Sequence, residues 1–560
     1  MSKKQKIILG LTILLSSCLF ATTMFRSGLV YDFGVGFWGP NGHDGIWHLA
    51  LINQLAKNIP PQNPVFSGTV LNNYHWGFDL FVSLISTLTS IKPILLYFQI
   101  FPFIFAVILG LLSFKLVYQI TQKFPQSLFF VLLNYFASSF GWIITLIKNR
   151  QIGGESMFWS MQSVSTLLNP PFAFSLIILL SGLILWHRYK NGSSVLAAIL
   201  IGIIFSLLSG IKVYSGVLIG FGLSFYWLVN FLISKKFSKF NFFICLFTGV
   251  FSFTILCLLG VFRQASLLEF KPLWFIHSMI ESIDKFYWPK LASYRYNQTN
   301  SIILLLIDLF LITVFLVGNL GTRICGIFKL LITFFKKKNT DIDLIFIPIL
   351  TSSFLIPLLF VQKGTAWNTI QFFYYFLFIA NFYFASFLGS LWGKQKKIVL
   401  IILLLSCLGS YGTLKDYFGN PPPSALPLNE LAGLNFLKNQ PEGIVLTYPY
   451  DKYLKNNFST PIPLYAYETT AYTSAFSQKI IFLEDEMNLD ITGFDWQSRR
   501  NLVDKFFHST DKFFTRGFLV DNDIKYIYLV NDQKLPLNPA ELQVNEIYNQ
   551  SNVKLYQVQR

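Results

Sequence analysis

Charged residues are scarce in this sequence. Asp, Glu, Lys and Arg make up 13% of its 560 residues, whereas 53% are hydrophobic and 18% are aromatic. The charged share is about half of that in soluble domains, so the apolar side chains could not be covered in water. This excludes an ordinary cytosolic enzyme, a disordered chain and a fibrous protein. The composition predicts a polytopic α-helical membrane protein whose aromatic rings fill a helix bundle and its interfaces.

Cysteines are also few, and they form no recognisable pattern. All 5 lie in or beside apolar segments, and none stands in a CxxC pair. The sequence therefore implies neither a disulfide framework nor a cysteine zinc site. A nucleotide-binding loop is missing as well, which disfavours the direct use of a nucleotide-linked substrate inside the cell.

Acidic residues are distributed unevenly, which explains the net charge of +17. Residues 1–413 contain 30 Lys and Arg but only 10 Asp and Glu, whereas residues 414–560 contain 14 and 17. The basic excess belongs to the membrane part, where Lys and Arg set the topology. Because the one clearly soluble segment is slightly acidic, we expect no nucleic-acid partner.

Eleven apolar runs are near or above the ~20 residues needed to span a bilayer. They are 7–25, 94–118, 127–147, 166–187, 195–211, 213–233, 242–262, 301–320, 343–361, 367–391 and 397–413. A shorter run at 77–91 is interpreted as a juxtamembrane or half-inserted helix, because a twelfth crossing would turn most basic clusters outward. About eleven transmembrane helices place the N-terminus in the cytoplasm. Loops 26–93 and 263–300 and the C-terminal tail then lie outside the cell membrane.

A proline-rich linker at residues 419–424 separates the predicted transmembrane domain, residues 1–418, from residues 425–560. The second part has the pattern of a small extracytoplasmic α/β domain. Helical stretches are expected at 428–437 and 498–508, and strands at 444–448, 479–483, 524–530, 544–548 and 553–558. Arg499 and Arg500 are expected on a solvated helix face.

The first outer loop holds an unusual group of polar residues. The run after Asp44 is predicted to be helical, and it places His48 on the same face as Asp44, four residues on. His75 and Asp79 repeat this spacing. Two His/Asp pairs beside a membrane suggest a functional site. The candidate residues of this loop are His43, Asp44, Trp47, His48, His75 and Asp79.

Other roles for these residues stay open. Asp44 could cap a helix that starts at Gly45, and the Trp side chains could anchor at the membrane interface. Asp44, His48, His75 and Asp79 are acceptable ligand types for a divalent metal, but their spacing is too common to be specific. A metal is not favoured, and we expect no cofactor.

The layout and the first loop resemble the glycosyltransferase C superfamily, which includes protein mannosyltransferases and lipid A aminoarabinose transferases. The matching stretch is GHDGIWHLALINQLAKNIPPQNP, followed by Gly68 and by Tyr74-His75. The resemblance implies a polyprenyl-phosphate-linked sugar as donor and Asp44 as general base. The paired acidic motif of the mannosyltransferases is absent, because Asp44 is followed by Gly45. Many members also end in an extracytoplasmic α/β domain.

Basic residues on the outer side need an explanation other than topology. A buried lysine is costly unless it is paired, which makes Lys212, in a tight turn between two crossings, the strongest candidate. The candidate donor-phosphate-binding residues are Lys212, Lys363, Arg263 and Arg295. Snorkelling to lipid headgroups would explain each of them equally well. Asn368 and Gln371 share a helix face and are candidate substrate ligands, although such a face more often joins helices.

An inverting glycosyl transfer would use these groups together. Asp44 would take the proton of the acceptor hydroxyl, and the basic residues would stabilise the leaving lipid phosphate. The sequence thus predicts a membrane glycosyltransferase with a glycan, lipid or protein acceptor in the cell envelope. Two alternatives stay open. Asp308, in mid-span without an obvious partner, favours a transporter or lipid flippase, and the tail could belong to a non-catalytic envelope scaffold.

Overall fold

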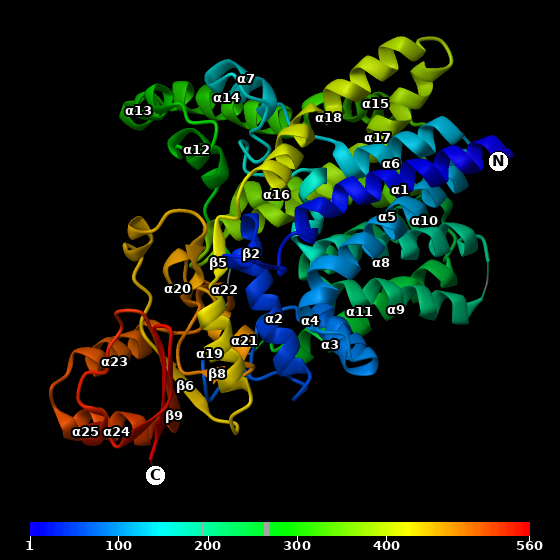
Figure 1. Cartoon of the computed structure of the whole chain (residues 1–560). Helices are drawn as coiled ribbons and strands as arrows, with labels where there is room; N and C mark the ends of the chain where they lie inside the picture. Colours follow the sequence, from blue (N-terminus) through cyan, green and yellow to red (C-terminus); the bar gives the residue numbers. More distant parts are fainter. Residues whose placement is uncertain (193, 263–267, 560) are drawn as a thin grey trace.

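The computed structural model describes residues 1–192, 194–262 and 268–559. A helix bundle forms one part of the molecule, and a smaller α/β part adjoins one end of it (Figure 1). The N-terminus lies at the end of the bundle away from the α/β part, and the C-terminus lies within that part. Sheets of 4, 5 and 2 strands accompany the helices among the described residues. The chain is thus mostly helical, as predicted.

Long apolar runs form the bundle because a helix satisfies its own backbone hydrogen bonds. Within the described ranges, 9 helical segments are long and apolar enough to cross a membrane. They are α1 (Lys3–Phe25), α4 to α5 (Pro93–Thr121), α8 (Pro170–Tyr189), α10 (Val213–Ser234), α11 (Lys239–Leu258), α14 to α15 (Ser301–Phe335), α16 (Asp341–Leu359), the segment ending in α17 (Ala366–Trp392) and α18 (Lys396–Gly419).

Two further predicted crossings have less regular helices. The run at 127–147 forms α6 (Phe124–Phe136) and α7 (Gly141–Asn149), which are bent by 48° and make a tenth span if they are counted together. The run at 195–211 forms α9 (Val195–Ile211), which is shorter and packs against α8, α10 and α11. Every predicted run therefore falls on a helix, while the number of crossings stays a prediction.

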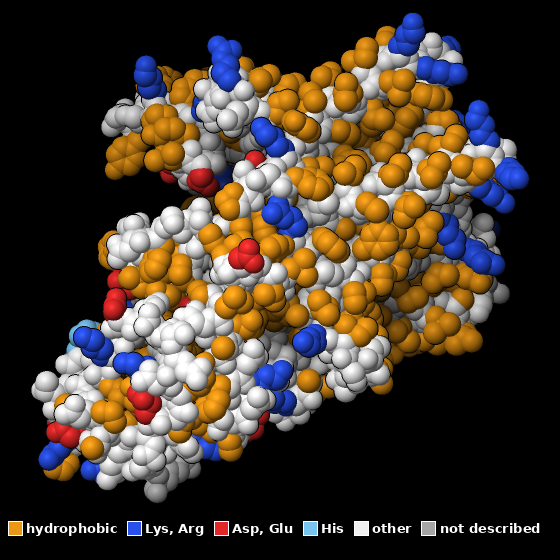
Figure 2. Space-filling model, viewed as in Figure 1, with side chains coloured by type: hydrophobic (Ala, Val, Ile, Leu, Met, Phe, Trp, Pro, Cys, Tyr) orange, Lys and Arg blue, Asp and Glu red, His pale blue; other side chains and the backbone are white. Residues whose placement is uncertain are grey.

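Apolar side chains dominate the surface of the bundle. Figure 2 shows them over the helices, with Lys and Arg side chains gathered at the end of the bundle where the N-terminus lies. The α/β part has a more mixed surface. This distribution is typical of helices that face lipid and carry basic residues at one membrane boundary. The orientation in the membrane stays a prediction.

The first outer loop forms two helices at the junction of the two parts. In α2 (Asp44–Leu55), every residue from Gly45 to Leu55 is buried, because the α/β part covers the side that does not face the bundle. The Asn53 side chain, for example, donates a hydrogen bond to the Ala475 carbonyl at 2.8 Å. α3 (Gly77–Thr89) has 13 residues and is too short to cross a bilayer by itself, in agreement with the sequence interpretation.

The second outer loop is also structured. It contains β3 (Leu268–Phe270), α12 (Trp274–Glu281) and α13 (Pro289–Asn297). β3 pairs antiparallel with β4 (Phe360–Gln362), which follows α16. Arg263, expected in this loop as a phosphate ligand, lies outside the described residues.

The α/β part is built on a five-stranded sheet with the order β10-β11-β9-β6-β8. β6 (Ile444–Thr447), β8 (Ile480–Ile481) and β9 (Ile524–Val530) are parallel, and β10 (Val544–Gln550) and β11 (Val553–Val558) add an antiparallel edge. The helices are α19 (Leu428–Lys438), α20 (Leu464–Tyr467), α21 (Tyr472–Ser477), α22 (Glu486–Thr492), α23 (Gln497–His508), α24 (Lys512–Asp521) and α25 (Pro539–Leu542). All five expected strands form at the expected positions.

A second sheet joins the first outer loop to the α/β part. Its order is β1-β2-β5-β7, in which β1 (Val30–Tyr31) and β2 (Gly34–Phe37) come from the loop. β5 (Ser424–Leu426) and β7 (Ile462–Pro463) come from the C-terminal part. Residues 64–67 also pair with the edge of β8, since Ser67 donates its N–H to the Ile481 carbonyl at 3.1 Å. The predicted linker at 419–424 therefore leads into a shared sheet.

Arg499 and Arg500 correct a sequence expectation. Instead of standing on a solvated helix face, the Arg499 guanidinium lies 3.5 Å from the ring centroid of Phe66 and 4.6 Å from that of Phe482. Arg500 forms ion pairs with Glu486 and Asp504. The helix period alone could not predict this, because the loop that carries Phe66 is far away in the sequence.

Candidate active site

Asp44 lies at the start of α2, where the first outer loop meets the α/β part. Its side chain is 53% exposed, and its Oδ1 lies 2.9 Å from Nδ1 of His43. The other ring nitrogen of His43, Nε2, lies 3.3 Å from Oδ1 of Asp485, whose side chain is fully buried. Asp44 is the first residue of α2, and His43 occupies the N-cap position without a side-chain capping hydrogen bond. Asp44 is therefore not the helix cap, which was one of the roles open from the sequence.

The surroundings of Asp44 stabilise its ionised form. Burial by the surrounding protein would raise the pKa of this carboxyl, but the hydrogen bond from His43 and the charges of His43, His48 and Lys212 outweigh it. The pKa of Asp44 therefore lies below its ordinary value. Its place in the first turn of α2 acts in the same direction, because the N-terminal end of a helix carries partial positive charge.

His43 holds Asp44 through its own charge. Burial alone would lower the pKa of His43, but the neighbouring Asp485 and Asp44 raise it well above its ordinary value. As an imidazolium, the ring donates a hydrogen bond from Nδ1 to Asp44, while its Nε2 lies beside the Asp485 carboxylate without forming a hydrogen bond with a described residue. Asp44 is thereby oriented by a residue of the other part of the molecule.

The two His/Asp pairs have different partners from those that the spacing predicts. His48 pairs with Asp79, at 2.7 Å between Nδ1 and Oδ1, and Asp44 pairs with His43. Asp79 is fully buried and His48 is 6% exposed, so this pair joins α2 to α3. Trp47 is 1% exposed and packs edge-on against Tyr74. Trp47 and Asp79, expected to bind substrate, are thus buried in the core, and substrate binding by them stays a prediction.

Two glycines permit the close packing around Asp44. A Cβ on Gly45 would lie 2.7 Å from the Phe98 ring, which gives a local reason for glycine after Asp44. A Cβ on Gly77 would lie 2.6 Å from the backbone oxygen of Gly210. The start of α3 thus touches the end of α9, immediately before Lys212. This contact brings the first outer loop and the Lys212 turn together.

Lys212 lies between α9 and α10 and is 4% exposed. Its Nζ donates a hydrogen bond to Oδ1 of Asn169 at 3.4 Å and lies 5.5 Å from the Tyr214 ring centroid. Burial lowers the pKa of Lys212 to about 7, although the charges of Asp44 and Asp79 act to raise it. Lys212 is therefore a buried cation within electrostatic reach of Asp44, and an anion bound beside it would stabilise its charge.

A chain of amides extends from Lys212 to the start of α17. Asn169 donates to Oε1 of Gln371 at 3.2 Å, Gln371 donates to Asn368, and Asn368 donates to Oε1 of Gln362 at 2.7 Å. Asn368 and Gln371, candidate substrate ligands, are thus connected to the Lys212 site. They also join helices, which is the other role that the sequence left open.

Three other predicted residues lie in different surroundings. His75 stacks on Tyr74, and burial together with the charges of Lys212 and His48 lowers its pKa well below the ordinary value. Lys363 is exposed on the loop after β4. Arg295 donates from Nε to Oδ1 of Asp308 at 2.8 Å, so its charge is already balanced. Phosphate binding by Lys363 and Arg295 stays a prediction.

Asp308 has partners, which corrects the sequence interpretation. Besides Arg295, His277 lies beside the carboxylate, at 3.0 Å between Nε2 and Oδ1. Both partners come from the second outer loop, where helical spacing within α14 could not reveal them. The unpaired mid-span carboxylate that favoured a transporter is therefore an ion pair between α13 and α14.

Metal ligation by the first outer loop was a weaker alternative. Among the residues that the structure describes, no group of three or more His, Cys, Asp and Glu side chains is arranged to hold a metal ion. Asp44, His48, His75 and Asp79 do not form such a group. Metal dependence stays a prediction.

Asp485, Glu468 and Asn169 belong to the site but are not evident from the sequence. Burial raises the pKa of Glu468, whose carboxyl is within electrostatic reach of His43 and Asp44. In the sequence, Asp485 stands in the acidic run 484–486, and Asn169 precedes two prolines. Glu468 has no such local signal. Neither signal indicates proximity to Asp44.

A scan against protein-family models finds no match, and a search of curated proteins finds none. Solved structures do match. The apo oligosaccharyltransferase of Archaeoglobus fulgidus has a TM-score of 0.52 at 11% identity, over 95% of this chain and 70% of that chain. The same enzyme with zinc and sulfate has a TM-score of 0.51 at 13% identity, over 92% and 67%. Arabinofuranosyltransferase AftD from Mycobacteria has a TM-score of 0.50 at 12% identity, over 100% of this chain and 40% of that chain.

The fold is that of the glycosyltransferase C enzymes. This confirms the resemblance that the layout and the first outer loop indicate. Together with the apolar helices, it identifies a multi-pass membrane protein. Because the identities are so low, the roles of individual residues cannot be transferred from these structures. The activity is therefore argued from the geometry of the site.

Proposed function

We propose that the protein is a membrane glycosyltransferase that moves a sugar from a polyprenyl-phosphate donor to an extracytoplasmic acceptor. The main support is that the half-exposed carboxylate of Asp44 and the buried amine of Lys212 lie within electrostatic reach of each other. They come from segments that are far apart in the sequence. The glycosyltransferase C fold supports the same class of reaction.

Asp44 acts as the general base. The acceptor oxygen attacks C1 of the donor sugar and gives its proton to Asp44. The bond between C1 and the phosphate oxygen breaks, and the lipid phosphate leaves with the bonding electrons. This single displacement inverts the configuration at C1. His43 keeps Asp44 oriented and anionic before the attack.

Lys212 binds the donor phosphate. Negative charge grows on the phosphate oxygen as the bond breaks, and a preorganised cation in a water-poor site stabilises it strongly. Asn169 and Gln371 orient the lysine and offer amide contacts to the donor. Lys212 takes the charge-stabilising role here, without a divalent metal.

The polyprenyl chain occupies an apolar cavity of about 340 Å³ between α14 to α15, α16 and α17. Thr351 is the one polar side chain among its described lining residues. α17 carries Gln371 at its start and Phe376, little more than one turn later, in this cavity.

Replacement of Asp44 tests the proposal. Membranes containing the full-length protein are incubated with labelled polyprenyl-phosphate sugars and mixed acceptors, and label transfer is measured. Asp44→Asn keeps the size of the side chain but cannot take the proton, so transfer should fall by about 10²–10⁴-fold. Asp44→Ala should be equally inactive, although it also removes the hydrogen bond between His43 and Asp44.

Asp32→Asn is the matched control, since Asp32 is an exposed carboxylate of the same loop. It should transfer label at the wild-type rate. Transfer by Asp44→Asn at a rate close to that of Asp32→Asn would refute the role of Asp44 as base.

A further inference from the structure

A cavity of about 370 Å³ lies in the α/β part, next to the Asp44 site. Its walls include residues 447–451, 483–486 and 530–533, which follow the parallel strands β6, β8 and β9. Ligands of open α/β sheets bind outside the carboxyl ends of such strands. The volume falls within the roughly 300–1,000 Å³ that is usual for ligand pockets.

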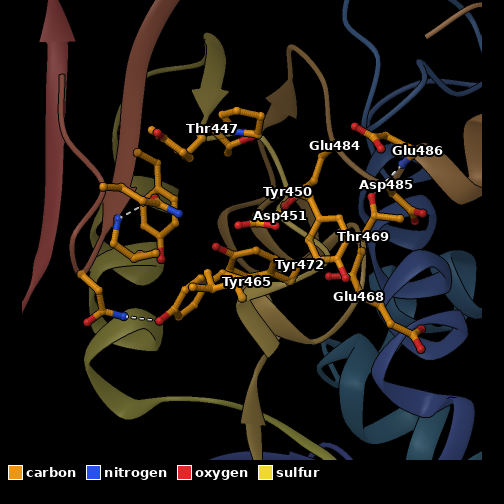
Figure 3. A pocket seen from close by; sticks show the side chains of 18 of the residues that line it. Thr447, Tyr450, Asp451, Tyr465, Glu468, Thr469, Tyr472, Glu484, Asp485 and Glu486 are labelled. Carbon is orange, nitrogen blue, oxygen red and sulfur yellow. Dashed lines mark hydrogen bonds between the residues drawn. The ribbon is translucent and has the colours of Figure 1, made fainter. Parts of the chain in front are cut away.

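The lining combines aromatic rings with carboxyl and amide groups. In Figure 3, Tyr450, Tyr465, Tyr472 and Glu468 stand around the hollow. The Tyr465 hydroxyl accepts a hydrogen bond from Asn531 at 2.7 Å, which fixes the position of the ring. Neither Lys nor Arg occurs among the described lining residues. Aromatic faces suit the apolar face of a sugar ring, and carboxyl and amide groups suit its hydroxyls.

A buried hydroxyl in the lining has no partner in the protein. The Thr470 side chain is 3% exposed, and its Oγ1 forms no hydrogen bond with any described residue. Thr470 lines the cavity. Buried polar groups are nearly always hydrogen-bonded, because an unpaired one loses its bonds to water without replacement. Thr470 therefore points to a ligand with hydrogen-bonding groups.

The charge state of the cavity suits a neutral ligand. Burial raises the pKa of Glu484 to about 8, although the N–H groups of Thr473 and Ser474 donate to it. Near neutral pH this carboxyl is largely protonated, so it can donate as well as accept hydrogen bonds. The two cations beside the lining, His43 and Arg500, are already paired with Asp485 and Glu486, so phosphates and acidic sugars would find no free cation among the described lining residues.

The cavity lies beside the proposed general base. Asp485 and Glu468 belong to its lining, and in Figure 3 they lie on the side toward the N-terminal helices. Asp485 is the residue whose Oδ1 lies 3.3 Å from Nε2 of His43, and His43 in turn bonds to Asp44. Glu468 is half-buried and its carboxyl is within electrostatic reach of Asp44, so a ligand that fills the cavity and extends past Glu468 approaches Asp44.

We propose that this cavity is the acceptor subsite and that the acceptor is a neutral, hydroxyl-rich glycan, one hydroxyl of which is presented to Asp44. This role rests on the proposed function. An extended peptide is disfavoured, because β8, the sheet edge beside the cavity, is already paired with residues 64–67 and leaves no strand to extend.

Glycan binding by the full-length protein in lipid nanodiscs tests the subsite. The probes are an array of neutral, amine-bearing and acidic oligosaccharides and a set of peptides, followed by affinity measurement with the best neutral oligosaccharide. Thr470→Val should weaken this affinity about fivefold without lowering the melting temperature, since the lost hydroxyl has no partner in the protein. Tyr465→Ala removes a stacking ring and should weaken it about tenfold.

Tyr548→Ala is the matched control, because Tyr548 is a half-buried tyrosine on β10, away from the cavity lining. It should bind the oligosaccharide like the wild type, and so should Asp44→Asn. Loss of transfer without loss of binding thus separates the base from the subsite. Absent binding of every neutral oligosaccharide, preference for peptides or for charged glycans, or unchanged affinity in Thr470→Val and Tyr465→Ala would each overturn the proposal.

Discussion

Raising the pH should weaken donor binding by removing the charge of Lys212. Burial lowers the pKa of Lys212 to about 7, whereas an exposed lysine stays charged to much higher pH. Only the protonated amine attracts the donor phosphate. The lysine is cationic below this pKa and neutral above it, so affinity should be high in mild acid and fall as the pH rises through about 7.

The size of the effect follows from the charged fraction. With a pKa of about 7, roughly 90% of Lys212 is protonated at about pH 6, and about 3% at about pH 8.5. Apparent affinity scales with the binding-competent fraction, so the dissociation constant should rise about 30-fold over this range. A phosphodiester keeps one negative charge throughout, so the donor itself contributes no change.

The assay is equilibrium binding of a short prenyl-phosphoryl-glucose to the protein in nanodiscs at several pH values. Calorimetry in buffers of different ionisation enthalpy should also detect proton uptake on binding above about pH 7. Lys212 is one source of pH dependence near the site, and His43 and Glu484, whose pKa values are both raised, are a second. Lys212→Ala separates the two, because it should bind weakly at every pH if Lys212 carries the effect.

Lys212→Arg keeps its charge and should bind with little pH dependence, although its shape fits the lysine site less well. A wild-type dissociation constant that is flat between about pH 6 and about pH 8.5 would refute the assignment of the donor phosphate to Lys212. The same steep profile in Lys212→Ala would assign the effect to His43 or Glu484 instead.

Three further outcomes are expected. Gly77→Ala should lower the free energy of unfolding by about 1–3 kcal/mol, because its Cβ would meet a backbone oxygen of α9 at 2.6 Å. Gly10→Ala is the control and should not lower it, because there is open space around Gly10. Thermal unfolding in detergent measures both variants. Asp79→Ala should cost about 1–3 kcal/mol in the same assay, because His48 loses its buried partner; an unchanged melting temperature would contradict this. A reporter fused after Arg560 should be active only outside the cytoplasm, and activity inside would refute the predicted topology.

Features that depend on local pattern could be predicted from the sequence. The apolar runs fall on helices because length and hydrophobicity decide a membrane helix. The strands β6 and β9 lie where Ile444–Thr447 and Ile524–Val530 read as buried strands. Asp44 is predicted from its spacing with His48 and from the resemblance to the glycosyltransferase C superfamily, and Lys212 is predicted because a buried lysine is costly unless it is paired. In the structure, the first outer loop and the segment before Lys212 touch, because Gly77 packs against the backbone of Gly210.

Features that depend on long-range packing could not be predicted. The spacing of His75 and Asp79 suggests a pair, yet Asp79 bonds to His48, because α2 and α3 pack side by side and cover both side chains. The partners of Asp308 lie on α12 and α13, outside its own helix. Nothing near Asp44 in the sequence points to Asp485, since the α/β part that carries it is formed more than four hundred residues later.

The α/β part is therefore a structural component of the Asp44 site. It supplies Asp485, which faces His43, and it covers α2 so completely that no residue from Gly45 to Leu55 remains exposed. β2 of the first outer loop pairs antiparallel with β5 of the C-terminal part, with Gly36 opposite Ala425, and this pairing joins the two parts. His43 lies between Asp44 and Asp485, so the proposed base is positioned by the C-terminal part folded against the first outer loop. The same packing places the tyrosine-lined cavity beside Asp44, so the proposed acceptor binding and proton removal depend on one interface.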